Sequence, residues 1–139
     1  MHMDEDTSFC QQLADKSGSK NVRVLSDDGL PPATLRRLMS SADFMIGFRL
    51  HSAIVATSGL TPSITYYYVD KGRVYFDQLK ASDLAHPIEV LLEDDFMDQY
   101  SLSLAALQKD LPKTRASLKP AIESLRKDVT NAFEQLNSQ

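Results

Sequence analysis

The fold of this chain is constrained most by one stretch, residues 42–59, which combines a strand, an abrupt turn and a helix. Residues 44–46 form an apolar run that is too short for a buried helix, so the run predicts a buried parallel strand. Residues 52–58 then carry a helix, and Gly59 suits the C-cap of that helix. A buried strand that leads directly into a helix indicates an α/β fold.

Arg49 and His51 fall between this strand and this helix. A helix N-terminus offers free N–H groups and the positive end of the helix dipole, and arginine adds a planar fork of donors. Ligands of open α/β sheets also bind outside the carboxyl ends of the strands. The stretch therefore predicts an anion site. In the plainer interpretation, Arg49 pairs with a nearby carboxylate and His51 caps the helix.

Helices and strands alternate along the rest of the chain. Apolar, alternating or β-branched runs predict four strands, at residues 21–26, 44–46, 62–68 and 88–92. Helices are expected at residues 4–16, 31–39, 52–58, 74–79 and 93–109 and in the segment after Pro112. Right-handed crossovers between four strands give a parallel sheet with helices on both faces, a Rossmann-like three-layer sandwich. We expect residues 4–139 to form one such domain ending in two helices, and residues 1–3 to be a cloning remnant.

Several apolar side chains are expected in the core. In the first helix Phe9 and Leu13 are expected to face inward, and Phe76 and Leu79 are expected to anchor a later, short helix. The last segment carries a helix stripe with alternating spacings of four and three: Leu118, Ile122, Leu125, Val129, Ala132 and Leu136. We interpret the stripe as core packing rather than a coiled-coil seam, because it spans fewer than three heptads.

Composition excludes some classes of function. The net charge is −4 and no basic patch stands out, which argues against a nucleic-acid partner. The single cysteine, Cys10, cannot form an intramolecular disulfide and fits a reducing compartment. No apolar run approaches transmembrane length, so we expect a cytoplasmic chain, with contact to a membrane surface as the alternative. No His or Cys pair has metal-ligand spacing, so we predict no metal.

An ordered set of residues runs through residues 43–71: Asp43, Gly47, Arg49-Leu50-His51, Gly59, Pro62, Tyr68 and Lys71. With its apolar strand and helix, this set resembles the polysaccharide pyruvyltransferase family. The looser order of helices and strands extends the resemblance over nearly the whole chain. The likeness concerns the C-terminal domain of the family only.

The resemblance implies a two-domain transferase of glycosyltransferase-B-like fold. Such enzymes move the enolpyruvyl part of phosphoenolpyruvate to a hexose of a cell-surface polysaccharide or glycolipid, with no cofactor besides this donor. Arg49 would bind the phosphate or carboxylate of the donor, His51 would be the acid/base or a phosphate ligand, and Lys71 would be a second cation. Leu50, Ser52 and Tyr68 would complete the substrate-binding set.

The topology also predicts which side chains meet at the carboxyl edge of the sheet: Ser26, Asp27, Arg49, Leu50, His51, Tyr68, Asp70, Lys71, Glu93 and Asp94. Asp70 and Glu93 are candidate acceptors for sugar hydroxyls. Plainer interpretations stand beside these. Lys71 could be a solvated loop residue, and residues 66–68 could be ordinary strand packing. Residues 27–28 are expected to form a turn, and His86 is expected to be a surface loop residue.

The length of the chain departs from the family pattern, because the chain matches one of two domains. We expect it to fold alone, to need the family's N-terminal domain, and to have little or no transferase activity alone. A homo-oligomer is a further expectation. One alternative is the nucleotide-sugar-binding half of a glycosyltransferase. A second alternative is a non-catalytic interaction module.

Overall fold

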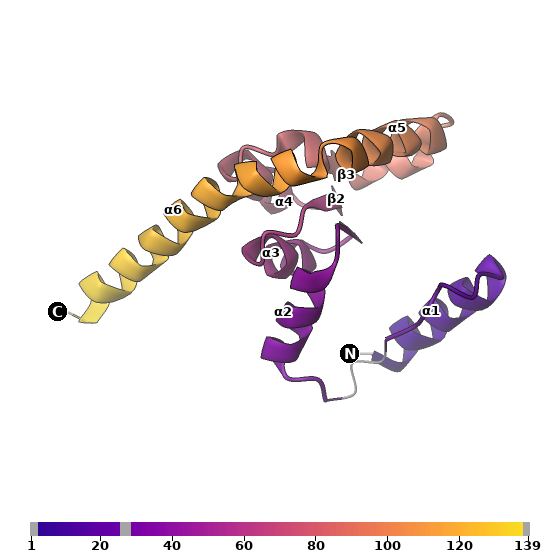
Figure 1. Cartoon of the computed structure of the whole chain (residues 1–139), viewed down its shortest axis with the longest axis horizontal. Helices are drawn as coiled ribbons and strands as arrows, with labels where there is room; N and C mark the ends of the chain where they lie inside the picture. Colours follow the sequence, from indigo (N-terminus) through magenta and orange to yellow (C-terminus); the bar gives the residue numbers. More distant parts are fainter. Residues whose placement is uncertain (1–2, 26–28, 138–139) are drawn as a thin grey trace. The chain divides into compact units, whose positions relative to one another are not determined.

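The computed structural model describes residues 3–25 and 29–137. Two compact units make up the chain, Met1–Pro32 and Ala33–Gln139. The first unit contains the helix α1 (Met3–Ser17), and the second contains the sheet with the remaining helices (Figure 1). The single domain expected over residues 4–139 stays a prediction.

The first unit confirms one predicted element and corrects another. The helix expected at residues 4–16 is α1, but Phe9 and Leu13 are exposed rather than inward-facing, and Cys10 is exposed as well. The strand predicted at residues 21–26 is wrong for residues 21–25, which form a turn and an irregular segment; Ser26 lies outside the described residues. An alternating run becomes a strand only beside a partner strand, and the described part of this unit offers none.

The second unit is built on a parallel sheet. Its described strands are β1 (Met45–Gly47), β2 (Ser63–Tyr67) and β3 (Ala85–Pro87), in the order β1-β2-β3. In the register, Gly47 lies opposite Thr65, and Tyr66 lies opposite His86. The prediction of an α/β fold with a parallel sheet is confirmed, with three described strands in place of four.

The strand predicted at residues 88–92 is wrong. These residues form a 3₁₀ helix, η2 (Ile88–Leu92), and the strand is the Ala-His-Pro segment just before it. A second 3₁₀ helix, η1 (Ser82–Leu84), leads into that strand. Pro87 has no N–H to continue the ladder, so the chain leaves the sheet after three residues.

The helices of the second unit fall close to their predicted positions. They are α2 (Pro32–Ser41), α3 (Leu50–Ser58), α4 (Lys71–Gln78), α5 (Phe96–Lys109) and α6 (Leu111–Asn137). Helix α3 connects β1 to β2, and α4 connects β2 to β3, as parallel strands require. Gly59 caps α3, and its N–H donates to the carbonyl of Ala56. A Cβ at Gly59 would overlap the Ser40 side chain, so glycine lets the end of α2 approach α3 closely.

Two helices cover opposite faces of β2. The Tyr66 ring contacts Phe96 of α5, with ring centroids 5.7 Å apart. A Cβ at Gly72 of α4 would meet the Tyr67 side chain. Because consecutive strand residues point to opposite faces, α5 and α4 lie on the two sides of the strand.

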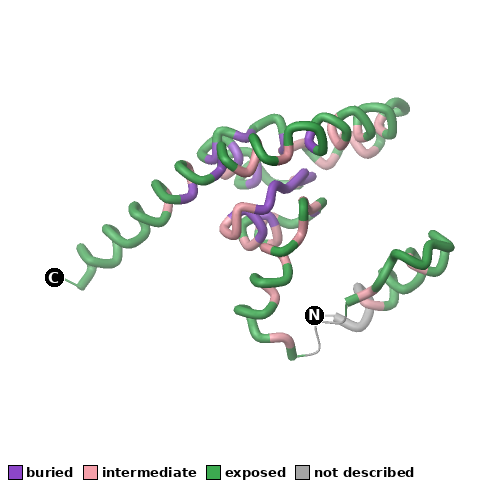
Figure 2. Tube along the Cα trace, viewed as in Figure 1, coloured by how far each residue is buried: buried purple, intermediate pink, exposed green. Residues whose placement is uncertain are grey.

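The core of the second unit surrounds β2 (Figure 2). Phe76 and Leu79 are fully buried, which confirms them as anchors of α4. Helices α5 and α6 close the core with buried leucine and isoleucine side chains: Leu107, Leu118 and Ile122. No helix among the described residues is long and apolar enough to cross a membrane.

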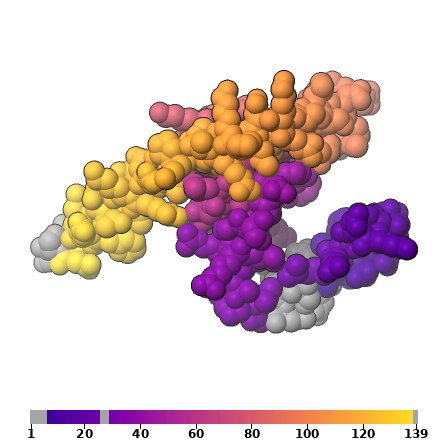
Figure 3. Space-filling view, viewed as in Figure 1, coloured from indigo at the N-terminus to yellow at the C-terminus, as the bar shows by residue number. Residues whose placement is uncertain are grey.

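The apolar stripe of α6 divides into a buried and an exposed part. Leu118 is 0% exposed and Ile122 is 5% exposed, which confirms core packing for the first half. Val129 and Leu136 are 56% and 69% exposed, so core packing is wrong for the second half. Pro120 lies inside α6. Figure 3 shows the yellow C-terminal half of α6 extending beyond the rest of its unit.

Candidate functional site

The carboxyl edge of the parallel sheet carries all six predicted site positions. Arg49 follows β1, and α3 begins there with Leu50, His51 and Ser52. Tyr68 follows β2, and Lys71 is the first residue of α4. Because β1 and β2 are parallel neighbours, both strand-to-helix connections lie at the same edge of the sheet. The assignment of these residues to substrate binding stays a prediction.

Arg49 lies at the N-terminus of α3. It is the N-cap residue, with an extended backbone (φ −132°, ψ 134°) that redirects the chain from the strand into the helix. Its carbonyl accepts the Ser52 hydroxyl at 2.7 Å. A Cβ at Gly47 would lie 3.0 Å from the Ser52 Oγ, so this hydroxyl sits directly beside the last residue of β1. The turn is therefore fixed by its own hydrogen bonds.

The charged groups at this edge lie open to water. Arg49, His51 and Lys71 are exposed, and Tyr68 is 65% exposed. A site with this exposure can bind an anion, but its charges are screened by solvent. Leu50, the first residue of α3, is half-buried.

The acidic residues predicted for this edge do not all lie there in the structure. Asp70 lies there, but its carboxylate is 3.8 Å from Arg73 and is already paired within α4. Glu93 and Asp94 follow η2 rather than a strand, because residues 88–92 are not in the sheet. Ser26 and Asp27, with the turn expected at residues 27–28, lie outside the described residues.

A row of aromatic rings crosses the sheet next to the carboxyl edge. Phe48, directly after β1, stacks on Tyr66 with ring centroids 5.5 Å apart and planes at 24°. The Tyr66 ring is 5.6 Å from the His86 ring on β3. The register explains the row, since Phe48 follows Gly47, the partner of Thr65, and Tyr66 is paired with His86. Tyr66 is 3% exposed, which confirms strand packing for this residue.

His86 was expected on a surface loop, and this prediction is wrong. It is a half-buried strand residue within the aromatic row. Burial lowers the pKa of its imidazole, and the nearby Asp83 carboxylate opposes that shift. Burial raises the pKa of Tyr66 on the same row, with a smaller contribution from Tyr100. Burial thus favours the neutral form of both side chains.

Sequence reasoning missed Phe48 and His86 as members of one cluster. A three-residue strand such as Ala-His-Pro carries no hydrophobic pattern of its own. The available signal was position, because the segment follows β2 by one crossover helix, which is where the next parallel strand is expected.

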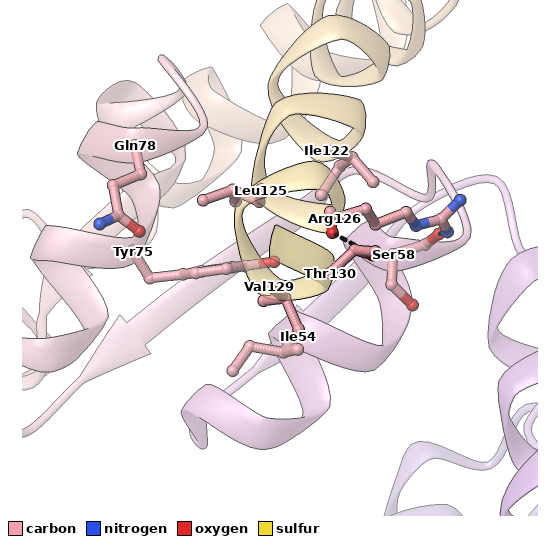
Figure 4. A pocket seen from close by; sticks show the side chains of 9 residues that line it. All are labelled: Ile54, Ser58, Tyr75, Gln78, Ile122, Leu125, Arg126, Val129 and Thr130. Carbon is pink, nitrogen blue, oxygen red and sulfur yellow. Dashed lines mark hydrogen bonds between the residues drawn. The ribbon is translucent and has the colours of Figure 1, made fainter. Parts of the chain in front are cut away.

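A pocket of about 540 Å³ lies away from this edge, among α3, α4 and α6 (Figure 4). Its lining residues are Ile54, Ser58, Tyr75, Gln78, Ile122, Leu125, Arg126, Val129 and Thr130. At its rim Arg126 donates to the Ser58 carbonyl at 2.7 Å. None of the predicted site residues lines this pocket.

Comparison with known protein families decides the family. Residues 2–70 match the family model of the polysaccharide pyruvyl transferases, which is about half of the chain. The chain belongs to the polysaccharide pyruvyl transferase family. The matched segment contains five of the six predicted site residues, and Lys71 lies one residue beyond it. No curated protein and no solved structure matches this polysaccharide pyruvyl transferase chain.

Proposed function

We propose that this chain binds phosphoenolpyruvate at the carboxyl edge of its sheet and supplies the donor side of pyruvyl transfer to a hexose of a cell-surface polysaccharide. One observation carries the proposal: the segment that matches the family contains the strand-to-helix turn with Arg49 as N-cap and His51 in the first turn of α3. Cytoplasmic synthesis, close to a membrane-bound acceptor, fits this reaction.

The residues at this edge suit a trianionic donor. Arg49 offers a fork of donors for a carboxylate or phosphate, and Lys71 adds a compact positive charge. The first N–H groups of α3 add further donors. As phosphate leaves, negative charge collects on its oxygens, and cations already in place stabilise that charge. His51 can exchange a proton with the acceptor or the leaving group near neutral pH.

The bonds of the proposed reaction balance with these groups alone. Two hydroxyl oxygens of the sugar form bonds to the central carbon of the enolpyruvyl group. The O–H bonds of those two hydroxyls break, and so does the bond from that carbon to the phosphate oxygen. One proton goes to the methylene carbon, which becomes a methyl group, and the other leaves with the phosphate. The products are a pyruvate ketal and inorganic phosphate.

We further propose that the fold corresponds to the C-terminal half of a glycosyltransferase-B-like enzyme and that a second domain supplies the opposite wall of the acceptor cleft. The exposure of Arg49, His51 and Lys71 supports this, because transfer to a sugar requires that water be kept from the donor. The chain alone is then expected to bind the donor and to turn it over slowly or not at all.

Thermal denaturation with phosphoenolpyruvate tests the proposed function. A ligand present at about 100 times its Kd adds about 2.7 kcal/mol, which is a shift of several degrees for a chain of this size. We expect the shift in the parent chain and its loss in Arg49→Ala and His51→Ala. The matched control Arg37→Ala, an exposed arginine of α2, should keep the shift.

Two results would contradict the proposal. One is a folded parent chain that shows no shift with phosphoenolpyruvate. The other is a shift that both Arg49→Ala and His51→Ala retain. A shift with uridine diphosphate but none with phosphoenolpyruvate would instead favour the nucleotide-sugar-binding alternative.

A further inference from the structure

Phe48 is the open end of the aromatic row. Its side chain is 50% exposed, whereas its stacking partner Tyr66 is 3% exposed. It is the residue directly before Arg49, so its Cα lies about 3.8 Å from that of the N-cap arginine. A large apolar ring is thus partly uncovered at the carboxyl edge of the sheet.

Other aromatic rings pack against one side of the Phe48 ring. It stacks on Tyr66 at 5.5 Å, and Tyr66 is fixed in turn by the ring of His86 at 5.6 Å and by the edge of Phe96 at 5.7 Å. Phe96 is itself backed by Tyr100, with centroids 5.9 Å apart. A ring supported in this way loses little further freedom when a ligand covers it, which favours binding.

We propose that Phe48 is the platform on which the acceptor sugar stacks, with Tyr66 and His86 as the side chains that position it. The proposal rests on the proposed function and deepens it. A pyranose ring has an apolar face of C–H groups that packs on an aromatic face, while its hydroxyls remain free for polar partners. A hexose on Phe48 would lie at the same carboxyl edge of the sheet as the proposed donor site, because Phe48 and Arg49 both follow β1 there.

Fluorescence offers a direct test, because the chain contains no tryptophan. Phe48→Trp preserves an aromatic face at this position and adds a single fluorophore. With phosphoenolpyruvate present, we expect its emission to change saturably with at least one of the methyl glycosides of galactose, glucose and mannose. The control Phe133→Trp, at a 62% exposed position of α6 outside the row, should not respond.

Saturation-transfer NMR on the same glycosides adds a readout without a new fluorophore. We expect the parent chain and Phe133→Leu to bind, and Phe48→Leu to bind about fivefold more weakly, the loss typical of one aromatic contact. Circular dichroism of Phe48→Leu establishes that the variant is folded.

The outcomes separate the two proposals. Glycoside binding that is equal in the parent and a folded Phe48→Leu overturns the platform, and so does a parent that binds phosphoenolpyruvate but no glycoside. A response of Phe48→Trp to uridine diphosphate but to no glycoside also overturns it and identifies a base-stacking site. A parent that binds no phosphoenolpyruvate, by contrast, contradicts the donor site itself.

Discussion

His86 shows how the burial of one residue changes its chemistry. The half-buried imidazole packs beside the Tyr66 ring, and burial outweighs the nearby Asp83 carboxylate, so its pKa in the folded chain is below the ordinary value of 6.5. In the unfolded chain the same ring titrates near that ordinary value. Below about pH 6.5 the unfolded chain therefore binds more protons than the folded chain.

The sign of the resulting pH dependence follows. The contribution of His86 to the free energy of unfolding is fully present above about pH 6.5 and is lost as the pH falls below that value towards the pKa of the folded state. Urea unfolding at pH 7.5 and 5.5 measures it. We expect His86→Phe and His86→Gln to show a smaller loss of stability on acidification than the parent. Equal losses in all three chains would contradict this assignment.

Single residues were predictable where local chemistry determines their role. Phe76 and Leu79 lie on one face of a short amphipathic helix, and they are buried as expected. Phe9 and Leu13 have the same kind of pattern, yet they are exposed, because burial requires a second apolar surface and the sequence of one helix does not supply it. His86 was misplaced for a related reason, since its surroundings depend on the register with β2.

At the scale of elements, the apolar stripe of α6 is buried in its first half and exposed in its second half. Leu118 is fully buried against the core, whereas Leu136, on the same stripe, is 69% exposed. Leu118→Ala should reduce the free energy of unfolding by about 2–5 kcal/mol, because it removes buried methyl groups and leaves a cavity. The matched control Leu136→Ala should change it by less than about 0.5 kcal/mol.

Urea unfolding of the two variants checks this division of α6. Similar losses of stability would contradict it, because they would mean that the C-terminal half of the helix packs against the core as well. A small change in Leu118→Ala alone would argue against the buried position of that side chain.

The sequence predicted most elements of the second unit because their patterns are local. Helices α3, α4, α5 and α6 show apolar spacing or end signals, and β2 is β-branched and aromatic. The short strands were mispredicted because a strand depends on hydrogen bonding to a neighbouring strand and not only on the hydrophobic pattern of its own residues. Residues 21–25 alternate without a described partner strand, and β3 is a strand only through its ladder with β2. The carboxyl edge itself was predictable from topology, but the aromatic row next to it was not.

At the scale of the whole molecule, the segment that matches the family and the second compact unit begin and end at different residues. The match ends at Asp70, after β2. The core around β2 also requires residues beyond it, because β3 completes the sheet and α5 and α6 contribute Leu107 and Leu118. The residues proposed to recognise the donor and those that support the sheet are thus partly separate along the chain.

The pocket among α3, α4 and α6 and the carboxyl edge of the sheet differ in chemistry. The pocket among α3, α4 and α6 is mainly apolar, and its arginine already donates to a carbonyl. The carboxyl edge carries Arg49, His51 and Lys71. The proposed function requires the anionic donor to bind at the carboxyl edge.

Mapping of backbone amide shifts by ¹H–¹⁵N NMR during titration with phosphoenolpyruvate tests this requirement most directly. We predict saturable shift changes that cluster at residues 49–52 and 68–71. Changes centred instead on Tyr75, Leu125 and Val129, or no changes in a well-folded chain at millimolar donor, would contradict a donor site at the carboxyl edge.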